Sequence, residues 1–200
     1  MTPGQEVVAG GRSYTVTMAT TFTRMDESTA EQWAVIGSET RANQGRVADR
    51  VLMLLESLGD ITDGFSTDQL THCLQTATMA ERAGADPEVV VAALCHDIGK
   101  AISVPNHPRI GAEILKPYVR NEVYEMILVH QDFQGRHYYA HFGADPDARE
   151  KHRGTVENFD LAARFADDWD QQAFDPDYDT LPLSHFEPMV REVFAKAKGI

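Results

Sequence analysis

The chain has 200 residues, 42% of them hydrophobic, which is enough for one domain with a sizeable core, with or without a terminal extension. It carries 31 acidic and 18 basic residues, and the net charge of −13 argues against non-specific nucleic-acid binding and against binding to an anionic membrane surface. Residues 1–11 lack the pattern of a secretory signal, and no apolar run approaches the roughly 18 residues of a membrane span. With only two cysteines and no sign of a disulfide framework, we expect a cytoplasmic protein.

The first 25 residues differ in pattern from the rest of the chain. Two short segments rich in β-branched residues, 6–9 and 13–20, flank Gly10 and Gly11, which favours a small β-hairpin. A loose extension is the alternative. From Ser28 onward the pattern becomes helical, so we predict an N-terminal extension over residues 1–25 and a helical domain over residues 26–200.

Apolar residues at helical spacing predict an all-α body. The stretch 88–96 is almost entirely apolar, which indicates a central buried helix, and Pro87 fits its first turn. Residues 131–154 are rich in His, Tyr and Gly and are expected to be an irregular segment close to a substrate pocket. The predicted helices cover residues 29–36, 46–58, 68–83, 88–96, 110–115, 122–130, 156–172 and 185–197.

An adjacent histidine and aspartate, His96 and Asp97, end the buried apolar helix and are followed by Gly99 and Lys100. Burying a carboxylate and an imidazole is costly unless something compensates for their polarity. A metal ion compensates both, because imidazole nitrogens and carboxylate oxygens are ligands for first-row divalent ions. The pair therefore indicates a metal site.

Further ligands are available at the ends of other predicted helices. His72 lies on the preceding helix, and two antiparallel neighbours would bring it close to His96. His107 and His130 lie downstream. A late aspartate follows near a tryptophan, where Asp167, Asp168 and Asp170 compete. The residues alone thus predict a site made of four histidines, Asp97 and one of these late aspartates.

This constellation resembles the HD-domain superfamily, an all-helical metal-dependent fold. With His107 and His130 as additional histidines, the sequence resembles the dinuclear branch of this superfamily. Within that branch it is more similar to the mixed-valent di-iron oxygenases, which include myo-inositol oxygenase and the HD oxygenases of organophosphonate breakdown. The segments that carry the likeness are residues 69–77, 84–100, 107–112 and 169–176. The resemblance implies two iron ions, Fe(II) and Fe(III), with O₂ as co-substrate.

The resemblance also implies a role for each ligand. Asp97 would bridge the two metals, and the Trp169-Asp170 pattern favours Asp170 as the last ligand, with Asp167 the next choice. One metal would be held by His72, His96 and Asp170, and the other by His107 and His130.

The implied activity is that of an oxidoreductase that cleaves a C–P or C–C bond in a small hydroxylated substrate, with organophosphonates among the candidates. The alternative is a metal-dependent HD phosphohydrolase acting on a nucleotide or phosphate ester, for which the same metals would activate water. A third class, a binding module with a degenerate site, is disfavoured because the ligand set is intact. We expect a small molecule as the partner, no nucleic acid and no membrane; the oligomeric state is left open.

Reacting and substrate-binding residues are expected close to the metals. His96, Asp97 and Lys100 are assigned to catalysis, and Lys100, Gln134, Arg136 and His137 to substrate binding, whereas Arg109 and Arg153 are expected to be surface charges. The substrate residues of phosphonate-cleaving relatives are not kept. Where those relatives carry a lysine after the fourth histidine, this chain has Gln134, and where they carry a basic residue after the last aspartate, it has Phe174. The tyrosine and glutamate that precede the first histidine in the relatives would fall near Thr62 and Phe65.

Overall fold

The computed structural model describes residues 5–9, 12–16 and 20–197. It divides the chain into two compact units, Met1–Arg46 and Val47–Ile200. This division lies 21 residues after the boundary expected at residue 25. The difference arises from helix α1 (Ala30–Gln44), which buries none of its residues and so has no apolar face to contribute to a helical core.

The first unit contains the expected hairpin. Strands β1 (Gln5–Ala9) and β2 (Arg12–Val16) pair antiparallel, with Val8 opposite Ser13. The expected second strand ran on to residue 20, and residues 17–19 of it lie outside the described part, as do Gly10 and Gly11. Helix α1 begins with a capping box in which Thr29 and Gln32 satisfy each other's backbone N–H, and it extends eight residues beyond the predicted end.

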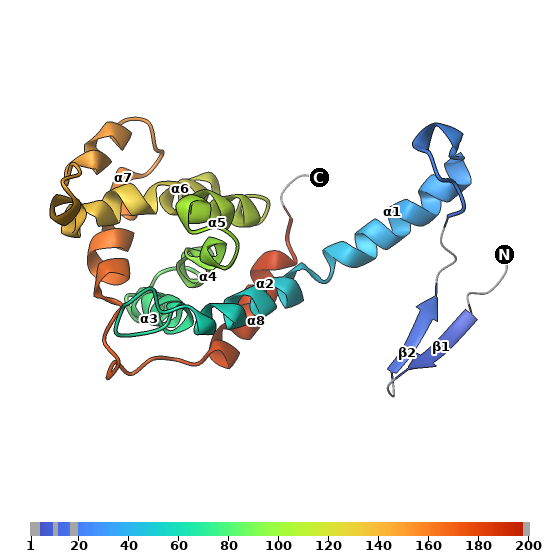
Figure 1. Ribbon diagram of the computed structural model, residues 1–200, viewed down its shortest axis with the longest axis horizontal. Coiled ribbons are helices and arrows are strands. Elements are labelled where there is room, and N and C mark those ends of the chain that lie inside the picture. The colour runs from blue at the N-terminus through green and yellow to red at the C-terminus, as the bar shows by residue number, and fades with distance from the viewer. Residues whose placement is uncertain (1–4, 10–11, 17–19, 198–200) are drawn as a thin grey trace. The chain divides into compact units, whose positions relative to one another are not determined.

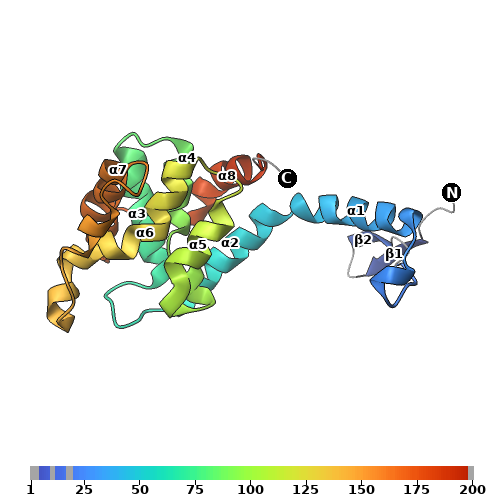
Figure 2. The ribbon, with the colours of Figure 1, turned by 90° about the horizontal axis from the view of Figure 1, so that it is seen from above.

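The described residues of the second unit form helices joined by loops and contain no strand, which confirms the all-α prediction (Figures 1 and 2). No helix among these residues has both the length and the apolar character needed to cross a membrane. The α-helices of this unit are α2 (Val47–Ser57), α3 (Gln69–Arg82), α4 (Pro87–Cys95), α5 (His107–Leu115), α6 (Asn121–Gln134), α7 (Phe159–Arg164) and α8 (Leu183–Phe194).

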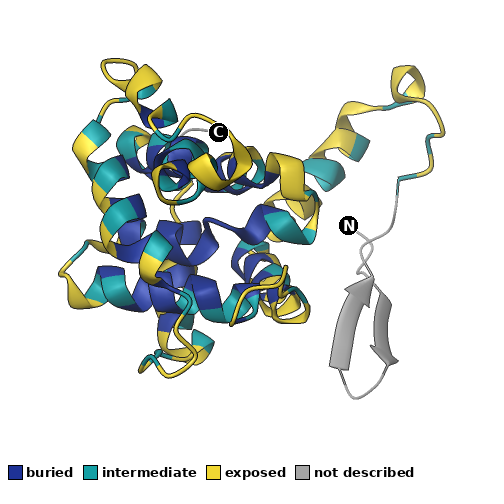
Figure 3. Cartoon of the chain, turned by 60° about the vertical axis from the view of Figure 1, so that its left-hand side comes forward, coloured by how far each residue is buried: buried dark blue, intermediate teal, exposed yellow. Residues whose placement is uncertain are grey.

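Helix α4 is the central element of the core, as its apolar sequence predicted. The Asp86 side chain accepts hydrogen bonds at its N-terminus, Pro87 occupies the first turn, and every residue from Val89 to Cys95 is buried. Helices α3, α5, α6 and α8 pack around it, and Figure 3 shows the buried interior that results. Because α4 is enclosed on all sides, the polar residues that follow it, His96 and Asp97, also begin inside the protein.

Two predicted segments differ from their expected structure. The expected helix 156–172 is broken into α7, a π-helical turn η8 (Phe165–Trp169) and a 3-10 turn η9 (Asp170–Gln172). Such π-turns are rare and are often found at functional sites. The expected irregular segment 131–154 begins as the last turn of α6 and continues as the 3-10 helices η5 (Gly135–His137), η6 (Tyr139–Phe142) and η7 (Ala148–His152).

Two glycines allow the segments around His96 and His107 to approach closely. A Cβ atom at Gly99 would lie 2.4 Å from the backbone oxygen of His107, and one at Gly111 would lie 2.8 Å from that of His96. A methyl group at either position would force the backbone apart. The α4 end and the α5 start are therefore held at a distance that only glycine permits.

We expect Gly99→Ala to destabilise the protein by about 1–3 kcal/mol, the usual cost of overpacking. This corresponds to a fall in Tm of roughly 2–4 °C per kcal/mol. Gly59→Ala is the matched control, because a Cβ atom there makes an ordinary contact of 3.9 Å with Leu70. Thermal unfolding followed by circular dichroism measures both variants, and equal Tm values would contradict the close approach.

Candidate metal centre

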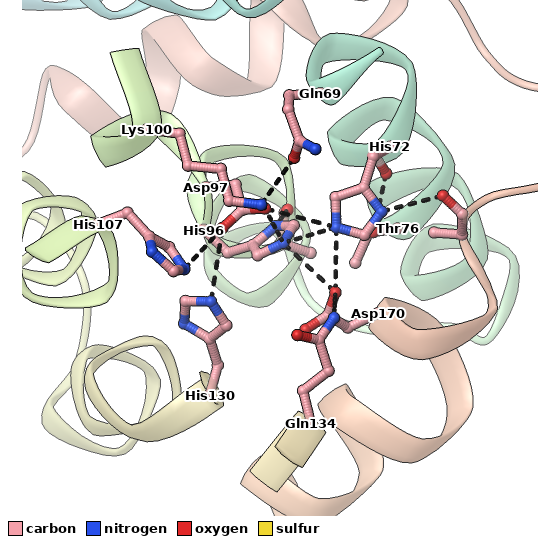
Figure 4. A network of polar contacts seen from close by, with 12 residues as sticks. Gln69, His72, Thr76, His96, Asp97, Lys100, His107, His130, Gln134 and Asp170 are labelled. Atoms are coloured by element: carbon pink, nitrogen blue, oxygen red, sulfur yellow. Dashed lines mark hydrogen bonds and ion pairs between the residues drawn. The ribbon is translucent and has the colours of Figure 1, made fainter. Parts of the chain in front are cut away.

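The six predicted ligands converge in the interior of the helical unit (Figure 4). They come from five different parts of the chain: α3, the end of α4, the start of α5, α6 and the turn η9. Each is buried, with an exposed fraction of 7% or less. The six are His72, His96, Asp97, His107, His130 and Asp170.

One group of ligands forms where α3 begins and α4 ends. The two helices pack against each other and run in opposite directions, as the sequence predicted, so His72 faces His96. Their Nε2 atoms are 3.0 Å apart. The Asp170 Oδ1 atom lies 3.1 Å from the Nε2 of His72 and 3.4 Å from that of His96. These three side chains form a compact N, N, O set.

The Asp97 carboxylate lies between this set and a second one. Its Oδ2 is 3.4 Å from the Nε2 of His96 and 3.6 Å from that of His72. Its Oδ1 is 3.1 Å from the Nε2 of His107 and 3.6 Å from that of His130. Each oxygen of one carboxylate thus faces a different pair of histidines, which is the arrangement needed to bridge two metal ions.

All four histidines are oriented by a backbone carbonyl. In each ring Nδ1 lies 2.7–2.9 Å from a carbonyl oxygen, so Nδ1 carries a proton and Nε2 faces the centre, where the neutral imidazole offers its lone pair to a metal. Metal-binding histidines are characteristically held in this way. The acceptors are Ala173 for His72, Ala93 for His96, Val104 for His107 and Ile127 for His130.

Burial and charge act against each other at this centre. Burial opposes ionisation of Asp97 and Asp170, but the neighbouring histidines, His96 first, outweigh it and hold the pKa of both carboxyls well below the usual range. Burial also opposes protonation of His96, yet Asp97 and Asp170 raise the pKa of this imidazole well above its ordinary value. Burial lowers the pKa of His130. Two carboxylates therefore attract positive charge into a closed interior.

A metal ion fits the unsatisfied atoms of this centre. Asp97 Oδ1 and Asp170 Oδ2 are buried and accept no hydrogen bond, although Nε2 of His107 lies 3.1 Å from Asp97 Oδ1. The facing Nε2 lone pairs of His72 and His96 repel each other unless a proton or cation lies between them. Ligand atoms about 2.0–2.2 Å from one ion lie about 3 Å from each other, which is the spacing seen here.

The structure separates the two competing aspartates. Asp170 reaches the centre, whereas Asp167 binds Arg149 at 3.0 Å and His137 at 2.9 Å. Arg149 is itself buried, and its guanidinium needs this carboxylate. Asp167 therefore anchors the π-turn that directly precedes Asp170 instead of joining the six.

Two of the predicted substrate residues contact the ligands. Lys100 donates from Nζ to Asp97 Oδ2 at 2.7 Å and to Gln69 Oε1 at 2.9 Å. Gln134 donates from Nε2 to Asp170 Oδ1 at 2.9 Å. Among the described contacts, Arg136 and His137 touch none of the six, and both are exposed, because α6 ends at Gln134 and the chain then turns toward Asp167. Their assignment to substrate binding stays a prediction.

Two glutamines of α3 were missed by the sequence reasoning. Gln69 accepts the hydrogen bond from Lys100, and Gln75 binds the backbone of Asp175; both side chains are fully buried. Their spacing is the signal that identifies them. They lie three residues before and three after His72, and so on the same helix face.

The sequence model of the HD domain family matches residues 70–174, just over half of the chain. The chain belongs to the HD domain family. The match begins two residues before His72 and ends four after Asp170, so it covers all six predicted ligands.

A curated relative is similar to part of this chain. It is the hydroxymethylphosphonate dioxygenase of Gimesia maris, 33% identical over 97 residues. The alignment covers 41% of the chain and 48% of the relative, so the chain spans about half the length of the protein it matches. The likeness supports the resemblance to HD-domain oxygenases and does not fix the reaction.

We expect metal binding near neutral pH to release a proton. The raised pKa of His96 means that its imidazole is protonated in the metal-free protein, and a metal ligand must be neutral. Apparent affinity therefore falls as the pH drops below that pKa, by up to about tenfold per pH unit. Calorimetry in buffers of different ionisation enthalpy measures the release, and a heat that is independent of buffer would contradict it.

Variants of the two aspartates should have opposite effects. We expect Asp170→Asn to weaken metal binding at least tenfold, because a carboxylate ligand is lost. Asp167→Asn should keep the metal and lower stability by about 1–3 kcal/mol, because the buried Arg149 loses its partner. Metal analysis and thermal unfolding of both variants test this, and metal loss in Asp167→Asn alone would reverse the assignment.

Proposed function

We propose that this HD domain is a non-heme di-iron oxygenase. It would use O₂ to oxidise a small hydroxylated substrate and cleave a C–C or C–P bond in it. The observation that carries the proposal is the position of Asp97, whose two oxygens face two separate pairs of histidines. A mononuclear site would not need the second pair. The similarity to a dioxygenase supports the same reading.

The residues of the centre are suited to hold two irons. His72, His96 and Asp170 would hold one iron and His107 and His130 the other, with Asp97 between them. When bound, such a pair supplies a Lewis acid for a substrate hydroxyl and a redox-active ion for O₂. The imidazole and carboxylate ligands alone do not select iron over manganese or zinc.

The surrounding side chains set the carboxylates in place. Lys100 donates to Asp97 Oδ2 and Gln134 donates to Asp170 Oδ1, which leaves the opposite oxygen of each carboxylate without a hydrogen bond. Burial of the six ligands excludes bulk water from the reacting atoms. Lys100 is partly exposed and lies beside the bridging position, so it is the side chain we assign to a substrate oxygen.

The residues at the positions where relatives bind a phosphonate do not restrict the substrate to phosphonates. Where phosphonate-cleaving relatives carry charged residues, this chain has Gln134, Phe65 and Phe174. The two phenylalanine rings stack on each other with centroids 4.6 Å apart. Because these positions offer no cation to a phosphonate, C–C cleavage stays a full alternative to C–P cleavage.

The second candidate is a metal-dependent phosphohydrolase. Two bridged metals also suit the activation of water for attack on phosphorus. However, a nucleotide needs several cations around its phosphates, and among the described contacts one lysine, Lys100, touches the six ligands. This scarcity of positive charge favours the oxygenase.

Metal analysis of protein purified without added metal or chelator is the first test. We expect close to two irons per chain and O₂ consumption with a small hydroxylated compound. The substrate panel compares simple polyols with 1-hydroxyalkylphosphonates, and Asp97→Ala serves as the inactive control. A single divalent ion, or two manganese ions with hydrolysis of nucleotides or phosphate esters, would overturn the oxygenase in favour of the phosphohydrolase.

A further inference from the structure

His72 differs from the other three histidines in how its ring is held. His96, His107 and His130 each donate from Nδ1 to the carbonyl three residues earlier in their own segment. His72 instead donates to Ala173, 101 residues away in the chain. Local backbone geometry fixes the first three rings, whereas the orientation of His72 depends on tertiary structure.

The acceptor of His72 belongs to a short segment, residues 170–175, which we call the strap. The strap begins with the ligand Asp170, and three of its consecutive carbonyls accept hydrogen bonds from side chains on or just before α3. The donors are His72 to Ala173, Ser66 to Phe174 and Gln75 to Asp175. These hydrogen bonds thus attach the strap to the helix that carries His72.

Gln75 makes two hydrogen bonds to the strap. Its Nε2 donates to the Asp175 carbonyl at 2.6 Å, and its Oε1 accepts from the Asp175 N–H at 3.3 Å. The amide therefore pairs with the strap backbone in both directions, as another peptide group would. The side chain is fully buried, so water cannot replace these bonds without a cavity.

The strap also covers the ring of His72. The Phe174 ring lies parallel to the imidazole, with centroids 4.3 Å apart and an angle of 12° between the planes. The Phe65 ring stacks in turn on Phe174, with the two ring centroids 4.6 Å apart. One short segment thus supplies a ligand oxygen, the acceptor for Nδ1 of His72 and a ring that fixes its plane.

We propose that Gln75 is a positioning residue that couples His72 to Asp170 and thereby controls metal occupancy of that half of the centre. This inference rests on the proposed two-metal site. Without the amide, the strap detaches from α3, and His72 and Asp170 lose their shared geometry. His107 and His130 keep their local carbonyls and continue to bind the other ion.

The test compares Gln75→Leu with Thr78→Val, a matched control one turn further along α3. Thr78 is also fully buried, and its hydroxyl accepts from the N–H of Leu181, beyond the strap. Both variants remove a buried polar link between α3 and the C-terminal part of the chain. Only Gln75→Leu acts on the strap. We therefore expect the two variants to lose similar stability, and Gln75→Leu to lose more metal than Thr78→Val.

Anaerobic Fe(II) titration with metal analysis gives the main result. The wild type and Thr78→Val should bind two ions per chain, and Gln75→Leu should bind one ion with wild-type affinity and the other about 10–100-fold more weakly. After controlled exposure of the loaded protein to O₂, which oxidises one iron of the pair, the coupled mixed-valent electron paramagnetic resonance signal should form in the wild type and in Thr78→Val and be absent in Gln75→Leu. Gln75→Glu keeps the acceptor oxygen and loses the donor, so its affinity for the weakened ion should lie between those of the wild type and Gln75→Leu. It replaces Gln75→Leu if that variant fails to fold.

A second measurement needs no metal. In the metal-free protein, nuclear magnetic resonance should show faster exchange of the His72 Nδ1 proton in Gln75→Leu, with the His130 Nδ1 proton unchanged. Two ions bound at wild-type affinity by Gln75→Leu, or unchanged exchange at His72, would overturn the proposal. A wild-type chain that binds fewer than two ions would overturn the di-iron function instead, and the exchange rates would still decide the role of Gln75.

Discussion

Two carboxylates buried inside an all-helical core are the constraint on which the rest of this structure depends. Asp97 and Asp170 are almost fully enclosed, and an ionised carboxylate at that depth is stable only if positive charge and hydrogen bonds surround it. The chain supplies Lys100, Gln134 and four imidazoles for this purpose. Even so, one oxygen of each carboxylate has no hydrogen-bond partner. A core optimised for stability alone would not contain this arrangement, whereas a metal centre requires it.

Several of the imidazoles are oriented by backbone carbonyls close to the ends of helices. A carbonyl near the end of a helix has no partner inside the helix, and His96 uses such a group from Ala93. His107 binds the carbonyl of Val104, in the 3-10 turn that precedes α5. Placing ligands where regular hydrogen bonding stops lets the backbone orient each imidazole without a further side chain. The price is close packing of those ends, which Gly99 and Gly111 make possible.

The sequence predicted the parts of this protein that follow from local pattern. Apolar spacing located the helices of the second unit, and the buried His96-Asp97 pair located the centre, because polar residues inside an apolar helix need an explanation. Residues that act across long distances in the chain were harder to predict. The choice between Asp167 and Asp170 depended on Arg149, and the role of Gln75 depended on Asp175. The roles of Arg136 and His137 stay predictions, because they depend on a substrate rather than on a contact with the six residues of the centre.

In the proposed oxygenase, the strap would join metal binding to substrate recognition. Phe174 stands where relatives of the proposed kind carry a basic residue, and its ring also rests against His72 while its carbonyl accepts from Ser66. A change of this residue therefore alters the substrate-facing surface and the orientation of a ligand at the same time. In a site built this way, substrate preference cannot change freely at that position, since a new side chain must still hold the imidazole. The aromatic ring meets that requirement through stacking, without adding a charge beside the two buried carboxylates.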